Sequence, residues 1–255
     1  MNKLIDAIDQ VIEENNLPHE WSKEISTELK QLKHKKESKK RVDLRSYPFV
    51  TIDGKDAKDF DDAVFCEEES NGFMLQVAIA DVADIVKQGT ELDFEALKRG
   101  TSIYFPKKVI PMLPEEISNN LCSLVPKEDR NVLVCKIIFN KEGVINSYEF
   151  NEAIINSNKR FTYNEVEFLL QDKEINISSN ILQSIIALKK LTKKLLKERL
   201  KRNALEIDSS EPVLKFNNKD GISEISVPKR LFAHQMIEEA MISANICAAR
   251  FIKKH

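Results

Sequence analysis

The sequence predicts an α+β fold in which helices flank a mixed sheet core. Residues 73–79 and 132–139 are apolar enough to form central strands of a sheet. Residues 181–202 instead repeat isoleucine and leucine at helical spacing and leave lysines on the opposite face. The chain is therefore expected to contain both a sheet and long amphipathic helices.

The other elements follow from local signals along the chain. Residues 49–150 are rich in strand patterns, with a turn at residues 140–143 and a hairpin partner strand at residues 144–153. Helices are expected at residues 3–15, 20–34, 93–99, 114–120, 163–170, 181–202 and 229–254.

Composition is that of a soluble globular chain, because 42% of the 255 residues are hydrophobic and 31% are charged. No apolar run approaches membrane-spanning length and no signal peptide is present, which favours a cytoplasmic protein without membrane contact. The four cysteines show no paired spacing, so reduced structural thiols are expected. The four histidines form no metal-ligand pattern, which argues against a zinc site.

Two basic segments interrupt a chain whose net charge is only −2. Residues 30–41 are expected to form a solvated linker, and residues 189–202 to expose lysines on a helix face. Contact with phosphates is the alternative interpretation of each segment, because such contacts depend on where the lysines lie rather than on net charge.

The strongest chemical signal is a crowd of aspartates in residues 51–63. Ionised carboxylates this close raise one another's pKa, which favours one or two hard divalent metals with oxygen ligands, an arrangement that hydrolyses phosphodiesters. A solvated loop is the simpler alternative, but apolar strand-like residues flank the run on both sides. A helix-loop-helix calcium site fails, because an alanine and a valine stand where that loop needs an oxygen ligand and a glycine. The acids are Asp53, Asp56, Asp59, Asp61 and Asp62.

The run Asp53-Gly-Lys-Asp-Ala-Lys-Asp-Phe-Asp-Asp-Ala63 resembles the signature of the ribonuclease II and ribonuclease R family of exoribonucleases. Other blocks similar to that family follow in the family's order, at residues 42–53, 77–82, 99–106, 109–115 and 121–124. The resemblance covers nearly all of residues 42–255. It implies that residues 42–255 are an incomplete catalytic domain of the RNB type, preceded at residues 1–41 by N-terminal helices and a basic linker.

What the resemblance implies is hydrolysis of single-stranded RNA from its 3′ end, with Mg²⁺, to nucleoside 5′-monophosphates. Asp53, Asp59, Asp61 and Asp62 match the family's four catalytic, metal-binding aspartates. Asp53 and Asp62 are expected to be direct ligands and Asp59 to complete the metal site. Asp61 is expected to be a ligand or orienting group whose loss stops chemistry but not RNA binding. Asp56 lies outside the motif.

Tyr104 belongs to a Tyr-Phe-Pro block. A tyrosine on a strand is often a core residue, whereas the resemblance implies RNA binding by stacking on the 3′-terminal nucleotide, which sets the length of the final product. Pro106, Pro111 and Pro114 are expected to stiffen the surrounding loop.

Two residues depart from the family pattern, and three other polar residues lie near the end of the chain. Asn203 replaces the family's usual glycine, which an asparagine can do in left-handed backbone, and Asp84 adds an acid near the expected RNA path. Glu238 and Glu239 are adjacent on a helix, so they face different directions and are expected to be a surface or capping pair. Asn245 is a candidate polar contact.

The chain is expected to be truncated at both ends, because family members carry cold-shock domains before this region and an S1-type domain after it. The part of the catalytic domain beyond residue 255 is expected to supply an arginine and a glutamate at the scissile phosphate. The alternative to an active exoribonuclease is thus a weakly active or inactive fragment that binds RNA or metal and needs a companion fragment. A metal phosphoesterase for small molecules is a third alternative.

Overall fold

The computed structural model describes residues 3–32, 41–171, 176–205, 212–217 and 221–254. The chain divides into two compact units that do not follow chain order. The sheet unit comprises residues 38–84, 119–205 and 230–255, and the hairpin unit comprises residues 1–37, 85–118 and 206–229. The domain boundary expected at residue 41 stays a prediction.

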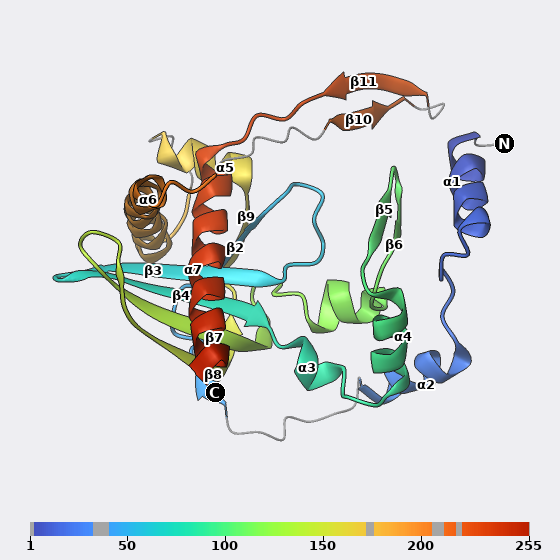
Figure 1. Ribbon diagram of the computed structural model, residues 1–255, viewed down its shortest axis with the longest axis horizontal. Coiled ribbons are helices and arrows are strands. Elements are labelled where there is room, and N and C mark those ends of the chain that lie inside the picture. The colour runs from blue at the N-terminus through green and yellow to red at the C-terminus, as the bar shows by residue number, and fades with distance from the viewer. Residues whose placement is uncertain (1–2, 33–40, 172–175, 206–211, 218–220, 255) are drawn as a thin grey trace. The chain divides into compact units, whose positions relative to one another are not determined.

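The sheet unit is built on one mixed sheet with the strand order β1-β8-β7-β4-β3-β2-β9 (Figure 1). Two pairs, β1 with β8 and β2 with β9, are parallel, and the other neighbours are antiparallel. The strands are β1 (Val42–Asp43), β2 (Val50–Asp53), β3 (Asp62–Glu69), β4 (Gly72–Ala80), β7 (Asp129–Asn140), β8 (Ile145–Asn156) and β9 (Lys159–Thr162). The predicted mixed sheet core is confirmed.

Close backbone packing and turn chemistry fix the two long hairpins. Gly72 begins β4 at a φ of +150°, and a Cβ there would lie 1.9 Å from the carbonyl oxygen of Phe139, so this position requires glycine. Between β7 and β8, the Asn140 side chain accepts the backbone N–H of Val144 at 2.9 Å, and Gly143 has a φ of +91°. The predicted turn at residues 140–143 is therefore confirmed.

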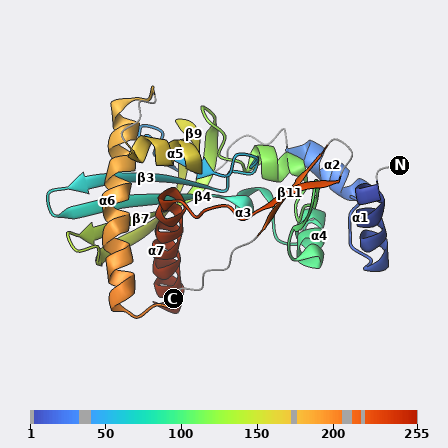
Figure 2. The same ribbon diagram turned by 90° about the horizontal axis from the view of Figure 1, so that it is seen from above.

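Three helices cover one face of this sheet: α5 (Tyr163–Leu170), α6 (Ser179–Lys201) and α7 (Phe232–Lys254). Thr162 and Glu165 form a capping box at the start of α5. The apolar stripe predicted for α6 is buried, and in Figure 2 α6 and α7 lie on the same side of the strands. Alternate residues of β2, β3, β4 and β7 complete this core, as the two-residue period of strands requires.

The hairpin unit contains three helices, α1 (Lys3–Glu14), α2 (Lys23–Leu32) and α4 (Glu91–Arg99), and two antiparallel hairpins. One hairpin pairs β5 (Ile103–Phe105) with β6 (Lys108–Ile110), and the other pairs β10 (Val213–Phe216) with β11 (Ile222–Ser226). Where the chain passes between units it forms α3 (Val82–Ile85) and a π-helical turn, Ile117–Leu121, near the helix expected at residues 114–120. Strands β9, β10 and β11 were not predicted.

The linker prediction for residues 30–41 is wrong at Arg41, and residues 33–40 lie outside the described residues. The Arg41 side chain is only 2% exposed and makes ion pairs with Asp81 at 2.7 Å and Asp84 at 3.4 Å. Asp84 also accepts a hydrogen bond from Asn131 at 3.1 Å, so the acid that departs from the family pattern faces a buried cation.

Two smaller predictions are confirmed, one for the backbone of Asn203 and one for the cysteines. Asn203 has a φ of +50°, which is the left-handed conformation expected of an asparagine in place of glycine. All four cysteines are buried and free of disulfides. Among the described helices, none combines the length and the apolar character that crossing a membrane requires.

Candidate active site

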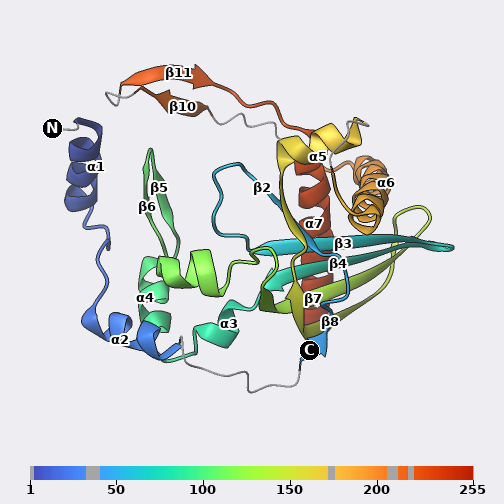
Figure 3. The same cartoon turned by 180° about the vertical axis from the view of Figure 1, so that it is seen from behind.

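The predicted acids lie on and around the connection from β2 to β3, which we call the acidic loop (residues 53–62). Asp53 is the last residue of β2 and Asp62 is the first residue of β3, and the two strands are antiparallel neighbours. The loop therefore leaves and re-enters the sheet at the same end of two adjacent strands (Figure 3). Asp53 also pairs with Thr162 of β9, so it lies beside the first turn of α5.

The fold brings the four motif aspartates close enough to affect one another's ionisation. Burial raises the pKa of Asp62 to about 6, and the charges of Asp53 and Asp61 add to that effect. Burial likewise raises the pKa of Asp61, together with the charges of Asp59 and Asp53. Asp56, which the motif leaves out, is an exposed residue of the same loop. The loop thus concentrates negative charge at one end of the sheet.

Asp53 experiences opposing effects. Burial raises the pKa of Asp53, and so does the charge of Asp59. A 2.6 Å hydrogen bond from the backbone N–H of Gly54 lowers this pKa, and so does the charge of Arg160. Burial is the largest of these effects, and the net direction is upward. Arg160 is a residue that the sequence did not single out, and it is the one cation among these influences on Asp53.

The donors at this site fit a hard divalent cation. Asp62 Oδ2 is buried and has no hydrogen-bond partner in the described part of the chain, which leaves a carboxylate oxygen available as a ligand. Within the described residues, however, no three His, Cys, Asp or Glu side chains form a ready-made metal group. The charge and the oxygen donors therefore suit a hard divalent cation, although the described side chains do not form a closed set of ligands.

Aromatic and polar side chains from α5 and α7 lie near the aspartates. The pKa of Tyr163, at the start of α5, is raised to about 12 by burial and by the charges of Asp53, Asp62 and Glu238. The Tyr163 ring stacks on His234 of α7 with 4.0 Å between ring centres and 22° between planes. Sequence reasoning placed Tyr163 in a helix without a role, and strand β9, which positions it beside Asp53, was not predicted.

The prediction of a surface or capping pair is wrong for Glu239. Its side chain is only 3% exposed and makes a 2.9 Å ion pair with Arg199 of α6, so it joins two helices of the core. Glu238 is well exposed and makes an ion pair with Arg230. Asn245 is exposed on α7, and its predicted role as a polar contact stays a prediction.

Tyr104 is on β5 of the hairpin unit, whereas the acidic loop belongs to the sheet unit. Its side chain is 70% exposed, which excludes the core tyrosine that a strand position often indicates. An exposed aromatic face is available for stacking on a base.

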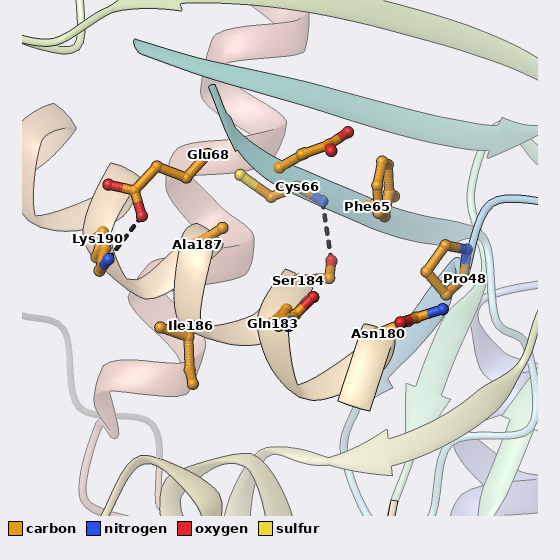
Figure 4. Close-up of a pocket in the computed structure, with 11 residues that line it drawn as sticks. Pro48, Phe65, Cys66, Glu68, Asn180, Gln183, Ser184, Ile186, Ala187 and Lys190 are labelled. Atoms are coloured by element: carbon orange, nitrogen blue, oxygen red, sulfur yellow. Dashed lines mark hydrogen bonds and ion pairs between the residues drawn. The ribbon is translucent and has the colours of Figure 1, made fainter. Parts of the chain in front are cut away.

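A separate pocket of about 500 Å³ opens between β3 and α6 (Figure 4). Three of its polar side chains already have partners in the protein: Ser184 accepts the backbone N–H of Cys66 at 3.0 Å, and Lys190 pairs with Glu68 at 2.6 Å. No aspartate of the acidic loop lines it. The acidic loop is therefore the better candidate for the active site.

Comparison with known proteins agrees with the motifs. The family model for the RNB domain matches residues 41–255. Ribonuclease R of Escherichia coli (strain K12) is 43% identical over 254 residues, which are 97% of this chain and 31% of that protein. Exoribonuclease 2 of Psychromonas ingrahamii is 39% identical over 221 residues, covering 84% of this chain and 34% of that protein.

The fold agrees as well. The structure of Mycoplasma genitalium RNase R in complex with ribose-methylated single-stranded RNA superposes with a TM-score of 0.90 at 31% identity, over 97% of this chain and 39% of that one. The chain thus spans about a third of the length of the relatives it matches. On its sequence, its fold and its aspartate loop, the chain belongs to the RNB domain family of ribonucleases.

Proposed function

We propose that this chain carries the aspartate part of a 3′-to-5′ exoribonuclease active site that hydrolyses RNA to nucleoside 5′-monophosphates with Mg²⁺. The observation that carries the proposal is the convergence of Asp53, Asp59, Asp61 and Asp62 on one loop of an RNB-family sheet. The family relationship and the relative solved with single-stranded RNA support RNA as the substrate.

The loop would hold the cation through carboxylate oxygens of Asp53 and Asp62, with Asp59 completing the set and Asp61 as a ligand or orienting group. Bound there, divalent ions would supply an activated water and neutralise charge on the attacking and leaving oxygens. Asp62 is mostly ionised at pH 7.5, because its pKa of about 6 lies below that pH. Its burial makes the ionised form costly without a cation, and this cost favours binding.

Tyr104 would hold the 3′-terminal nucleotide by stacking, since its ring is exposed and a π-face accepts any base. Such a contact does not depend on sequence, which suits an enzyme that removes successive nucleotides. The proposal therefore assigns chemistry to the acidic loop and positioning of the RNA end to Tyr104.

The test is a cleavage assay on a 5′-labelled single-stranded RNA with Mg²⁺, followed by gel analysis. Shortening from the 3′ end that EDTA stops is the expected result. The matched variants are Asp61→Asn, expected to abolish cleavage, and Asp56→Asn, expected to retain it. Both remove one charge from the acidic loop, so equal effects would contradict the proposed division between them.

The alternative is a chain that binds RNA without cleaving it, which is favoured by the lack of a ready-made three-residue metal group in the described chain. Fluorescence anisotropy with the same RNA separates the two functions. Binding by a folded chain that leaves the RNA intact, with Mg²⁺ present, would support the alternative and refute catalysis by this chain alone.

A further inference from the structure

The acidic loop holds several carboxylates together although they repel one another, so its backbone needs restraints from outside the loop. The first of these restraints comes from Arg160 on β9. Its Nη2 donates to the carbonyl oxygens of Gly54 at 2.6 Å and Lys55 at 2.8 Å. Its guanidinium carbon also lies 5.5 Å from the centre of the Phe60 ring, within cation–π range. One side chain therefore contacts both the start and the end of the loop.

Ser123 restrains the end of the loop. Its Oγ accepts the backbone N–H of Phe60 at 3.0 Å and donates to the carbonyl oxygen of Lys58, also at 3.0 Å. Ser123 is fully buried, so water cannot replace these two bonds without rearrangement. The next residue, Leu124, donates its backbone N–H to the carbonyl oxygen of Phe60 at 2.8 Å.

These contacts come from residues to which the family resemblance gave no role. Ser123 belongs to the block at residues 121–124, and Arg160 lies on a strand that the sequence did not predict. The position of Arg160 is set by the parallel pairing of β2 with β9. This pairing places Arg160 beside Thr51, close to the loop that leaves β2. Its hydrogen bonds to Gly54 and Lys55 go to carbonyl oxygens, so Arg160 itself occupies no carboxylate oxygen of the loop.

We propose that Arg160 and Ser123 are positioning residues that brace the acidic loop, holding its backbone in the conformation that presents Asp53 and Asp62 to a cation. The bracing itself stands on the contacts above, whereas its consequence for Mg²⁺ and RNA rests on the proposed function. A planar guanidinium suits this task, because it can bond two carbonyls and still present a face to an aromatic ring. A lysine at the same position keeps the charge but loses the planar donor geometry.

The first test uses hydrogen exchange in the metal-free protein, which does not depend on activity. Ser123→Ala and Arg160→Gln should each raise amide exchange in residues 54–61 at least about tenfold. The matched control is Ser184→Ala, because Ser184 is also buried and also accepts a backbone N–H at 3.0 Å, that of Cys66 on β3. The control should raise exchange at Cys66 and leave the loop unchanged. Loop exchange in the brace variants that equals the control would overturn the proposal.

The second test measures Mg²⁺ affinity by calorimetry at fixed pH. Residues that orient metal ligands typically change affinity by about 10-fold to 100-fold, so both brace variants should weaken binding by that factor while Ser184→Ala does not. Arg160→Lys should fall between wild type and Arg160→Gln. Should Ser123→Ala fail to fold, the two Arg160 variants decide the result, and unchanged Mg²⁺ affinity in both would overturn the proposal.

RNA cleavage separates this inference from the proposed function. If wild type cleaves, the brace variants should have a lower kcat at 1 mM Mg²⁺ that recovers at high Mg²⁺, with the KM for RNA little changed. A kcat that stays low at every Mg²⁺ concentration would contradict positioning through the metal. If wild type does not cleave, the proposed function fails for this chain, and the exchange experiment still decides whether the brace exists.

Discussion

Replacing Asp62 with asparagine should stabilise the metal-free protein at alkaline pH and have little effect near pH 4. The folded protein raises the pKa of this carboxyl from 3.8 to about 6. Below pH 3.8 the group is protonated in both the folded and the unfolded chain, so it contributes no charge to either. As pH rises, the carboxyl ionises first in the unfolded chain, near pH 3.8, so wild-type stability falls until the folded chain also ionises near pH 6. Above that pH the folded state bears the full cost of a buried charge beside Asp53 and Asp61.

The size of this effect follows from the same two pKa values. A difference of one pKa unit corresponds to about 1.4 kcal/mol, so the full change amounts to roughly 3 kcal/mol in the free energy of unfolding. The advantage of Asp62→Asn over wild type should therefore grow from pH 4 to pH 8 by up to that amount. Any contribution of the asparagine amide is independent of pH and shifts the whole curve without changing its slope.

Urea denaturation with EDTA present, at half-unit steps from pH 4 to pH 8, measures this difference. Asp129→Asn is the control, because hydrogen bonds from Asn156 and Arg45 lower the pKa of Asp129. The stability that Asp129 contributes is lost only as pH falls below about 4, so the control should differ from wild type by a constant amount above pH 5.

A flat difference between Asp62→Asn and wild type across this pH range would refute the reasoning. Mg²⁺ offers a second check on the same samples, because a ligand at 100 times its Kd stabilises the folded state by about 2.7 kcal/mol. Wild type should gain stability from saturating Mg²⁺ at pH 8, and Asp62→Asn should gain much less.

Three further predictions concern Asp61 in the acidic loop, Tyr104 as the proposed contact to the 3′ end of RNA, and Gly143 in the turn between β7 and β8. Asp61→Asn should stop cleavage while RNA binding, followed by anisotropy, stays near wild type, and retained cleavage would remove Asp61 from the mechanism. Tyr104→Ala should leave longer end products on a gel, and Tyr104→Phe should keep the wild-type length, so an unchanged length in the alanine variant would contradict stacking. Gly143→Ala should lower the free energy of unfolding by about 1–3 kcal/mol, because φ is +91° and the new Cβ would lie 2.8 Å from Cβ of Lys194. Urea denaturation tests this change, and wild-type stability would contradict it.

Sequence reasoning predicted the elements that carry strong periodicity. Helix α5 has the predicted bounds, and α6 buries the apolar stripe that its spacing indicated. Strand β9 was missed because its four residues contribute one fully buried side chain, Phe161, and a single apolar residue carries no period. Strands β10 and β11 consist almost entirely of exposed residues, so they lack the alternating pattern from which strands are recognised.

The candidate site was predictable where its residues are close in sequence and obscure where they are not. The aspartates lie within ten residues, so their spacing alone indicated a cation site. Arg160 contacts Gly54 across more than one hundred residues, a pairing that only the strand order reveals. The same limit explains the wrong prediction for Arg41. Its basic neighbours in the sequence indicated a solvated linker, whereas its partner Asp81 is forty residues away.

Two groups of aspartates in the sheet unit differ in their partners, and this difference bears on function. Asp81 and Asp84 share the buried guanidinium of Arg41, whose single positive charge offsets part of their negative charge. At the acidic loop, Arg160 directs its hydrogen bonds to backbone carbonyls, while Asp62 has a buried oxygen without a partner among the described residues. A cluster that served only stability would gain from a paired cation, as Asp81 does, because unpaired buried charge is costly. The hydrogen bonds of Arg160 instead restrain the loop backbone and occupy no carboxylate oxygen, which supports the proposed binding of a divalent cation at this loop.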